Sequence, residues 1–204
     1  MTFTIWLSLF TICLLGAMSP GPSLAIVAKH SLAGGRMNGV ATAWAHATGV
    51  AIYALVTLVG LATLLHKNPV LFKGISYLGA IYLGYLGVKA LRSKGGVAEK
   101  LESGQKVNVL QSAKEGFLIS LTSPKIMLFF TALFSQFVAA GSELFGRLLV
   151  VGTPYLVDGM WYTFIAFMLS SPVLLDKLRK KAVIIDRLSG IVLIILSIRV
   201  VWTA

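Results

Sequence analysis

Two ionisable side chains stand in the middle of long apolar segments, far from any polar stretch of the chain. Asp158 lies within the apolar segment 148–171, and Lys125 lies within the apolar segment 116–140. The other six acidic residues fall in polar stretches or at the ends of apolar segments, at positions 99, 102, 115, 143, 176 and 186. A charge at the centre of a bilayer costs about 2.5–3.5 kcal/mol on insertion scales, so residues of this kind are functional candidates.

The chemistry of this acid and base suits a small zwitterion. Lys125 could hold a substrate carboxylate, helped by backbone amides at the start of a helix and by the positive end of its dipole. Asp158 could hold an ammonium group or take up a coupling proton. The alternative is a mutual Lys125–Asp158 ion pair that only orients two helices.

Prolines interrupt two of the apolar segments. Pro20, Gly21 and Pro22 lie well inside the first segment, and Ser123 and Pro124 lie inside the fourth. Proline lacks an amide hydrogen and clashes with the preceding helical turn, so these motifs predict two half-helices that meet beside a cavity. A simple proline kink is the alternative at each position. We expect these five residues to contribute to a substrate site.

Three more side chains are candidates for the same site. His46 lies inside the second apolar segment and could relay protons, although a packing histidine would look the same in the sequence. Trp161 and Tyr162 follow Asp158 by about one helical turn and could line the cavity. The alternative for both is a place among ordinary core aromatics.

The elements that position these residues are helices in lipid. Of the 204 residues, 57% are apolar and 12% are charged, whereas a soluble domain carries about 25% charged residues. Water does not solvate a surface so poor in charge, so we predict an all-α membrane protein. Six apolar segments are visible, at 4–28, 38–65, 74–91, 116–140, 148–171 and 188–203. The last is short and contains Arg199, so five spans are the alternative.

The composition also limits which cofactors and partners can be expected. Cys13 is the single cysteine, and no His, Cys and carboxylate residues have the spacing of metal ligands, so neither a disulfide framework nor a cofactor is expected. The formal net charge is +11. Because the bases mostly lie between apolar segments, this charge indicates a lipid bilayer as the partner and not a nucleic acid.

The distribution of the bases predicts the orientation. The first, third and fifth loops carry twelve Lys and Arg residues, and the second and fourth loops carry three. By the positive-inside rule the odd loops are cytoplasmic, and the N-terminus faces outward.

A repeat relates the two halves of the chain. Ser19-Pro20-Gly21 recurs as Ser123-Pro124-Lys125, 104 positions later. Several apolar positions of the third segment recur in the sixth at a constant offset of 110, although chance matching of Leu-rich helices is the alternative there. Copies with three crossings enter the membrane in opposite directions, as in many secondary transporters. We predict one domain, with repeat one at about 1–92, a cytoplasmic linker at about 93–114, and repeat two at about 115–204.

Several of these motifs resemble the LysE/RhtB family of bacterial amino-acid exporters. The resemblance rests on residues 17–22 (AMSPGP), 35–39 (GRMNG), 79–87 (GAIYLGYLG) and 116–137, and on Asp158 with Trp161. It covers nearly the whole chain. The chain departs from the family pattern in having Ser123 for an Asn, Ser135 for a Pro, Ser23 for an Asn and Ala45 for a Gly. These departures affect which substrate is expected and not the class of protein, which remains an amino-acid exporter by this resemblance.

The resemblance implies efflux of a small amino acid or derivative across the bacterial inner membrane, driven by the proton motive force, with a homo-oligomer as a possible assembly. A membrane enzyme is the first alternative, and it would need a nucleophile and a base such as Ser23 and His46. A channel is the second, and it would need rings of charge or a filter motif. The sequence shows neither a nucleophile motif nor a filter.

Overall fold

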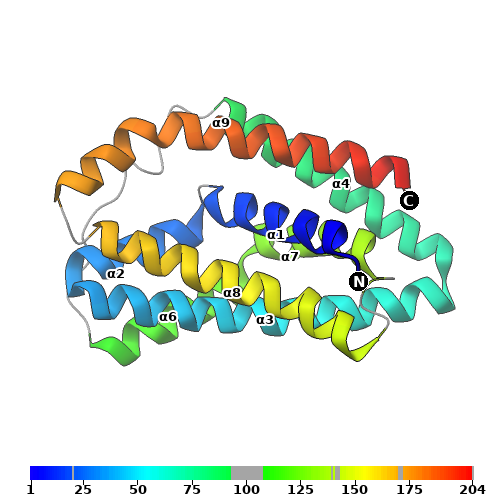
Figure 1. The fold of residues 1–204 in the computed structure, drawn as a ribbon, viewed down its shortest axis with the longest axis horizontal. Coiled ribbons are helices and arrows are strands. Elements are labelled where there is room, and N and C mark those ends of the chain that lie inside the picture. The colour runs from blue at the N-terminus through cyan, green and yellow to red at the C-terminus, as the bar shows by residue number, and fades with distance from the viewer. Residues whose placement is uncertain (20, 93–107, 139, 141–142, 170–171, 204) are drawn as a thin grey trace.

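The computed structural model describes residues 1–19, 21–92, 108–138, 140, 143–169 and 172–203 (Figure 1), and within these ranges it contains eight helices and no strand. The helices are α1 (Phe3–Met18), α2 (Pro22–Gly34), α3 (Arg36–Lys67), α4 (Pro69–Leu91), α6 (Val109–Thr122), α7 (Pro124–Phe137), α8 (Leu144–Leu169) and α9 (Pro172–Thr203). The predicted all-α class is confirmed.

Both predicted helix breaks are present. The axes of α1 and α2 differ by 61°, and those of α6 and α7 differ by 55°. Pro22 and Pro124 each stand at the start of the second helix of a pair, where a missing amide hydrogen costs no helical hydrogen bond. Ser19 and Ser123, which end the first helices, have extended backbone conformations. Each pair is therefore a bent element with helix termini in its middle.

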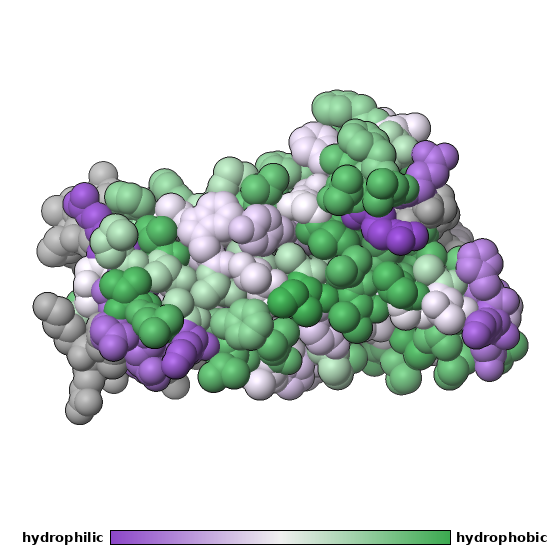
Figure 2. All heavy atoms as spheres, turned by 90° about the horizontal axis from the view of Figure 1, so that it is seen from below, coloured by the Kyte–Doolittle hydropathy of each residue, from purple (hydrophilic) through white to green (hydrophobic). Residues whose placement is uncertain are grey.

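The surface is suited to lipid. In the described part of the chain, α3, α4 and α8 are long and apolar enough to cross a membrane, and the number rises to five if each bent pair is one span. Large apolar side chains such as Val70, Ile81 and Phe145 are mostly exposed. On the face shown in Figure 2, hydrophobic residues cover most of the middle and the most hydrophilic residues gather mainly toward the two ends.

The helices form two groups that run along the same long axis (Figure 1). α4 and α9 lie side by side, and α3 packs against α6 and α8. The two termini lie at one end of the molecule, and the ends of α2 and α8 lie at the other. The main apolar cluster is centred on side chains such as Leu58, Leu83 and Phe134, so the bent pairs are held against the long helices by an ordinary packed core.

The basic segment predicted as the fifth loop is part of a helix. The backbone of α9 starts at Pro172 and runs through residues 177–187. Leu, Lys, Arg and Ala are all strong helix formers, and charge opposes burial in lipid without opposing the helix. Asp186, predicted to lie in a loop or at a span end, is inside α9 and only 3% exposed.

The linker predicted at about 93–114 falls mostly on residues 93–107, outside the described residues. Its last part is helical, because α6 begins at Val109. The side chain of Asn108 accepts a hydrogen bond of 2.7 Å from the Gln111 amide and caps this helix. The helix therefore begins well before the apolar segment does.

Close helix packing at Gly87 yields a prediction about stability. A Cβ atom at Gly87 of α4 would lie 2.8 Å from the Gly190 carbonyl oxygen of α9. Gly87→Ala should lower the unfolding free energy by about 1–3 kcal/mol, because overpacking forces the helices apart. The melting temperature of the purified protein in detergent measures this effect.

Gly74, in the same helix, serves as the matched control, because a Cβ atom placed there would have no heavy atom of another helix within 4 Å. Gly74→Ala should leave the melting temperature unchanged or raise it, because alanine is the better helix former. Equal melting temperatures of the Gly87→Ala and Gly74→Ala variants would contradict the close packing of α4 against α9.

Candidate functional site

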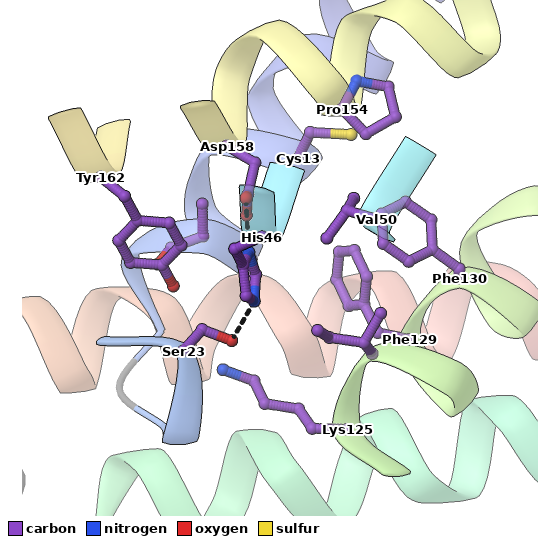
Figure 3. Close-up of a pocket in the computed structure, with 13 residues that line it drawn as sticks. Cys13, Ser23, His46, Val50, Lys125, Phe129, Phe130, Pro154, Asp158 and Tyr162 are labelled. Atoms are coloured by element: carbon purple, nitrogen blue, oxygen red, sulfur yellow. Dashed lines mark hydrogen bonds and ion pairs between the residues drawn. The ribbon is translucent and has the colours of Figure 1, made fainter. Parts of the chain in front are cut away.

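A small cavity lies beside the two helix breaks, with a volume of about 40 Å³ (Figure 3). Its walls come from α1, α2, α3, α7 and α8, so both halves of the chain contribute to it. The lining residues are Cys13, Gly16, Ala17, Ser23, His46, Val50, Lys125, Ile126, Phe129, Phe130, Pro154, Asp158 and Tyr162.

Three lining side chains form a hydrogen-bonded chain across three helices. Asp158 Oδ2 lies 2.7 Å from His46 Nδ1, and His46 Nε2 lies 2.9 Å from Ser23 Oγ. His46 is 1% exposed, whereas the Asp158 side chain keeps 12% exposure. The imidazole thus has a partner at each nitrogen, which fixes the orientation of its ring. The arrangement can accept, hold and pass on a proton.

Lys125 belongs to the first turn of α7, and its side chain lies beside the end of α1. Its Nζ donates a hydrogen bond of 2.7 Å to the carbonyl oxygen of Ser19, which ends α1. The negative end of a helix dipole favours a cation at this place. A Cβ atom at Gly21 would lie 3.3 Å from Nζ, so the missing side chain leaves room for the ammonium group beside the break.

Tyr162 also bonds the end of α1. Its hydroxyl donates a hydrogen bond of 3.1 Å to the carbonyl oxygen of Ala17, and its ring packs edge-on against His46 at 5.5 Å. Two carbonyls at the end of α1, those of Ala17 and Ser19, are therefore satisfied by side chains from α8 and α7, in the second half of the chain.

The opposite side of the cavity is apolar. It is lined by Val50, Ile126, Phe129, Phe130 and Pro154. Figure 3 shows Phe129 and Phe130 on one side of the Asp158–His46–Ser23 chain and Tyr162 on the other. Lys125 and Asp158 both line the polar side of the cavity. One side of the cavity thus carries both signs of charge, and the other side offers only carbon.

The structure brings together four of the predicted site residues, Lys125, Asp158, His46 and Tyr162. Gly21, Pro22, Ser123 and Pro124 form the breaks beside the cavity without lining it. The hydroxyl of Ser123 is buried and has no hydrogen-bond partner among the described residues. Pro20 lies outside the described residues.

Trp161 does not line the cavity. It is partly buried, packs beside a second apolar cluster and contacts the ring of Phe164 at 5.8 Å. The cavity-facing residues of α8 are Pro154, Asp158 and Tyr162, which follow one another at a spacing of four. Trp161 falls one position off this stripe and faces elsewhere.

The alternative of a mutual Lys125–Asp158 ion pair is not realised, since each side chain has a different hydrogen-bond partner in the described structure. The sequence analysis considered Ser23 as a possible nucleophile and as a departure from the family pattern, and it did not assign Pro154 or Cys13 to the site. The spacing of four from Pro154 to Tyr162 was the available signal. In the described part of the chain, no three His, Cys, Asp or Glu side chains converge as metal ligands.

Comparison with known proteins points in the same direction. The family described as LysE type translocator matches residues 14–203. An uncharacterized membrane protein of Pseudomonas aeruginosa is 37% identical over 161 residues, which are 72% of this chain and 71% of that protein. An uncharacterized membrane protein of Bacillus subtilis is 26% identical over 184 residues, which are 86% of this chain and 88% of that protein.

A named relative is the leucine efflux protein of Salmonella typhimurium, 38% identical over 123 residues, which are 58% of this chain and 56% of that protein. No solved structure matches the chain. The family match covers nearly all of the sequence, including both helix breaks and every lining residue of the cavity except Cys13. The chain is a multi-pass membrane protein and belongs to the family of LysE type translocators.

Proposed function

We propose that the protein exports a small amino acid or derivative across the bacterial inner membrane in exchange for protons. The observation that carries this proposal is one cavity, beside two helix breaks, that contains both an ammonium group and a carboxylate with an apolar wall opposite them. The leucine efflux proteins among its relatives support an amino acid as the substrate.

The cavity is complementary to a zwitterion. Lys125 would bind the substrate carboxylate, Asp158 would bind its ammonium group, and the Phe129 and Phe130 side would accept an aliphatic side chain. A volume of about 40 Å³ holds water molecules but not an amino acid. Binding therefore requires the half-helices to move apart, and the bent pairs supply the hinges for such a movement.

The proposed topology has six crossings in two inverted repeats. Two bent pairs followed by two long helices each, α1 to α4 and α6 to α9, support this arrangement. It requires α9 to be the sixth crossing. The distribution of basic residues favours a cytoplasmic location for the end where α2 ends and α6 begins, and an outward N-terminus.

Coupling would follow from competition at one carboxylate. Asp158 holds a substrate ammonium group only while it is ionised, and a proton from outside would neutralise it and release the substrate. His46, at 2.7 Å, gives that proton an onward acceptor. Export against a gradient would then depend on the return of protons into the cell.

The charged pair gives the first test of this function. Asp158→Asn and Lys125→Ala should each slow leucine transport into proteoliposomes by at least about 10-fold, because each removes a charge-assisted contact worth about 1.5–3 kcal/mol. Glu143→Gln, at an exposed residue outside the cavity, is the control and should behave as the unmodified protein does. Unmodified transport rates in both site variants, with normal insertion, would refute the assignment.

The apolar wall gives a second test. Phe129→Ala should reduce the preference for leucine over threonine by about 10-fold, since it removes apolar contact to an aliphatic side chain. Competition of unlabelled amino acids with labelled leucine measures that preference. Phe145→Ala, at a ring that is 68% exposed, is the matched control. An unchanged preference in the Phe129 variant would place the substrate side chain elsewhere.

A further inference from the structure

A second imidazole in the molecule has nearly the same set of partners as His46. His30 of α2 is 1% exposed, its Nε2 lies 3.0 Å from Glu115 Oε2, and its Nδ1 lies 3.0 Å from Ser112 Oγ. His46 likewise has a carboxylate at one nitrogen and a serine hydroxyl at the other. Because α2 carries both Ser23 and His30, the two groups are separated by seven residues, or about 10 Å along the helix.

Buried polar side chains continue between the two imidazoles. Asn38, Thr42 and His46 follow one another on α3 at a spacing of four, and each is at most 6% exposed. Asn38 Nδ2 donates a hydrogen bond of 2.8 Å to Ser112 Oγ, and Thr42 Oγ1 lies 3.2 Å from the Ser112 carbonyl oxygen. We call His46, Thr42, Asn38, Ser112 and His30 the polar column.

The polar column ends at a partly exposed carboxylate. Glu115 Oε2, which contacts His30, also forms an ion pair of 2.8 Å with Lys29 Nζ. The Glu115 and Lys29 side chains are 26% and 40% exposed. They lie where α2 ends and α6 begins, at the end of the molecule proposed to face the cytoplasm. The column thus leads from the cavity to a partly exposed ion pair at that end of the molecule.

We propose that the polar column is the cytoplasmic half of a proton path, with His30 as its last carrier. This inference rests on the proposed proton coupling. Thr42 is 0% exposed in this structure, so the path opens only when the half-helices have moved apart and water reaches this residue. A proton that leaves the Asp158–His46 pair then passes through that water to a nitrogen of His30. The resulting imidazolium is stabilised by Glu115, and the proton then leaves to cytoplasmic water, so that His30 returns to its neutral form and no other bond changes.

A purely structural role is the competing explanation, because the same contacts hold α2, α3 and α6 together. The two roles differ in what they affect. Exchange of labelled for unlabelled substrate needs the binding and movement steps but no net proton transfer, whereas accumulation driven by a pH gradient needs both. A proton carrier should be required only for the second process.

The test uses His30→Gln, which keeps a hydrogen-bonding side chain but has no titratable nitrogen. In proteoliposomes that contain the full chain, leucine exchange should stay within about 3-fold of the unmodified protein. Accumulation driven by the pH gradient, and the accompanying signal of an internal pH dye, should fall at least about 10-fold. Glu115→Gln should likewise spare exchange and lower accumulation. His66→Gln is the matched control, because His66 is exposed and lies at the end of α3 far from Asn38.

Three outcomes would overturn the inference. A parallel fall of exchange and accumulation in the His30 variant would indicate a structural role, and full coupling in that variant would exclude His30 as a carrier. Net leucine transport by the unmodified protein without any proton flux would remove the proposed coupling and the path together. The first two results leave the proposed export function standing, so the failures are distinguishable.

Discussion

A helix that is interrupted within lipid leaves carbonyl and amide groups that have no water to bond with, and each such group costs several kcal/mol unless the protein satisfies it. At the end of α1, the carbonyls of Ala17 and Ser19 are bonded by Tyr162 and Lys125. Both donors belong to the second half of the chain. The requirement to complete one broken helix therefore draws the two halves together and brings a cation to the centre of the molecule.

The same requirement explains why the cavity has its polarity. Lys125 is held by a carbonyl and not by Asp158, which leaves the carboxylate to His46. A direct ion pair would have neutralised both groups and left little for a substrate to bind. Separate partners keep two opposite charges beside one cavity, and the carbon wall of Phe129 and Phe130 completes a surface for a zwitterion with an apolar side chain.

The sequence was most informative where backbone chemistry or the cost of charge in lipid decides the outcome. Proline motifs predicted both breaks, and the isolation of Asp158 and Lys125 predicted that they share a site. Predictions failed where the outcome depends on the direction of one side chain or on burial that the hydropathy pattern does not reveal. Trp161 lies one position off the cavity stripe of α8, and Asp186 is buried in a helix that extends beyond its apolar segment. Pairing across helices, as for Asp158 with His46, leaves no trace in local spacing.

Cys13 adds a practical consequence. It is the single thiol of the chain, and it lies in the wall of the cavity close to the end of α1. Cys13 is buried in this structure, so a thiol-directed reagent would modify this one known position only when the cavity opens, with no need to remove other cysteines first. Reagents that do not cross the bilayer, added from one side at a time, would show from which compartment the interior can be reached at each stage of the cycle.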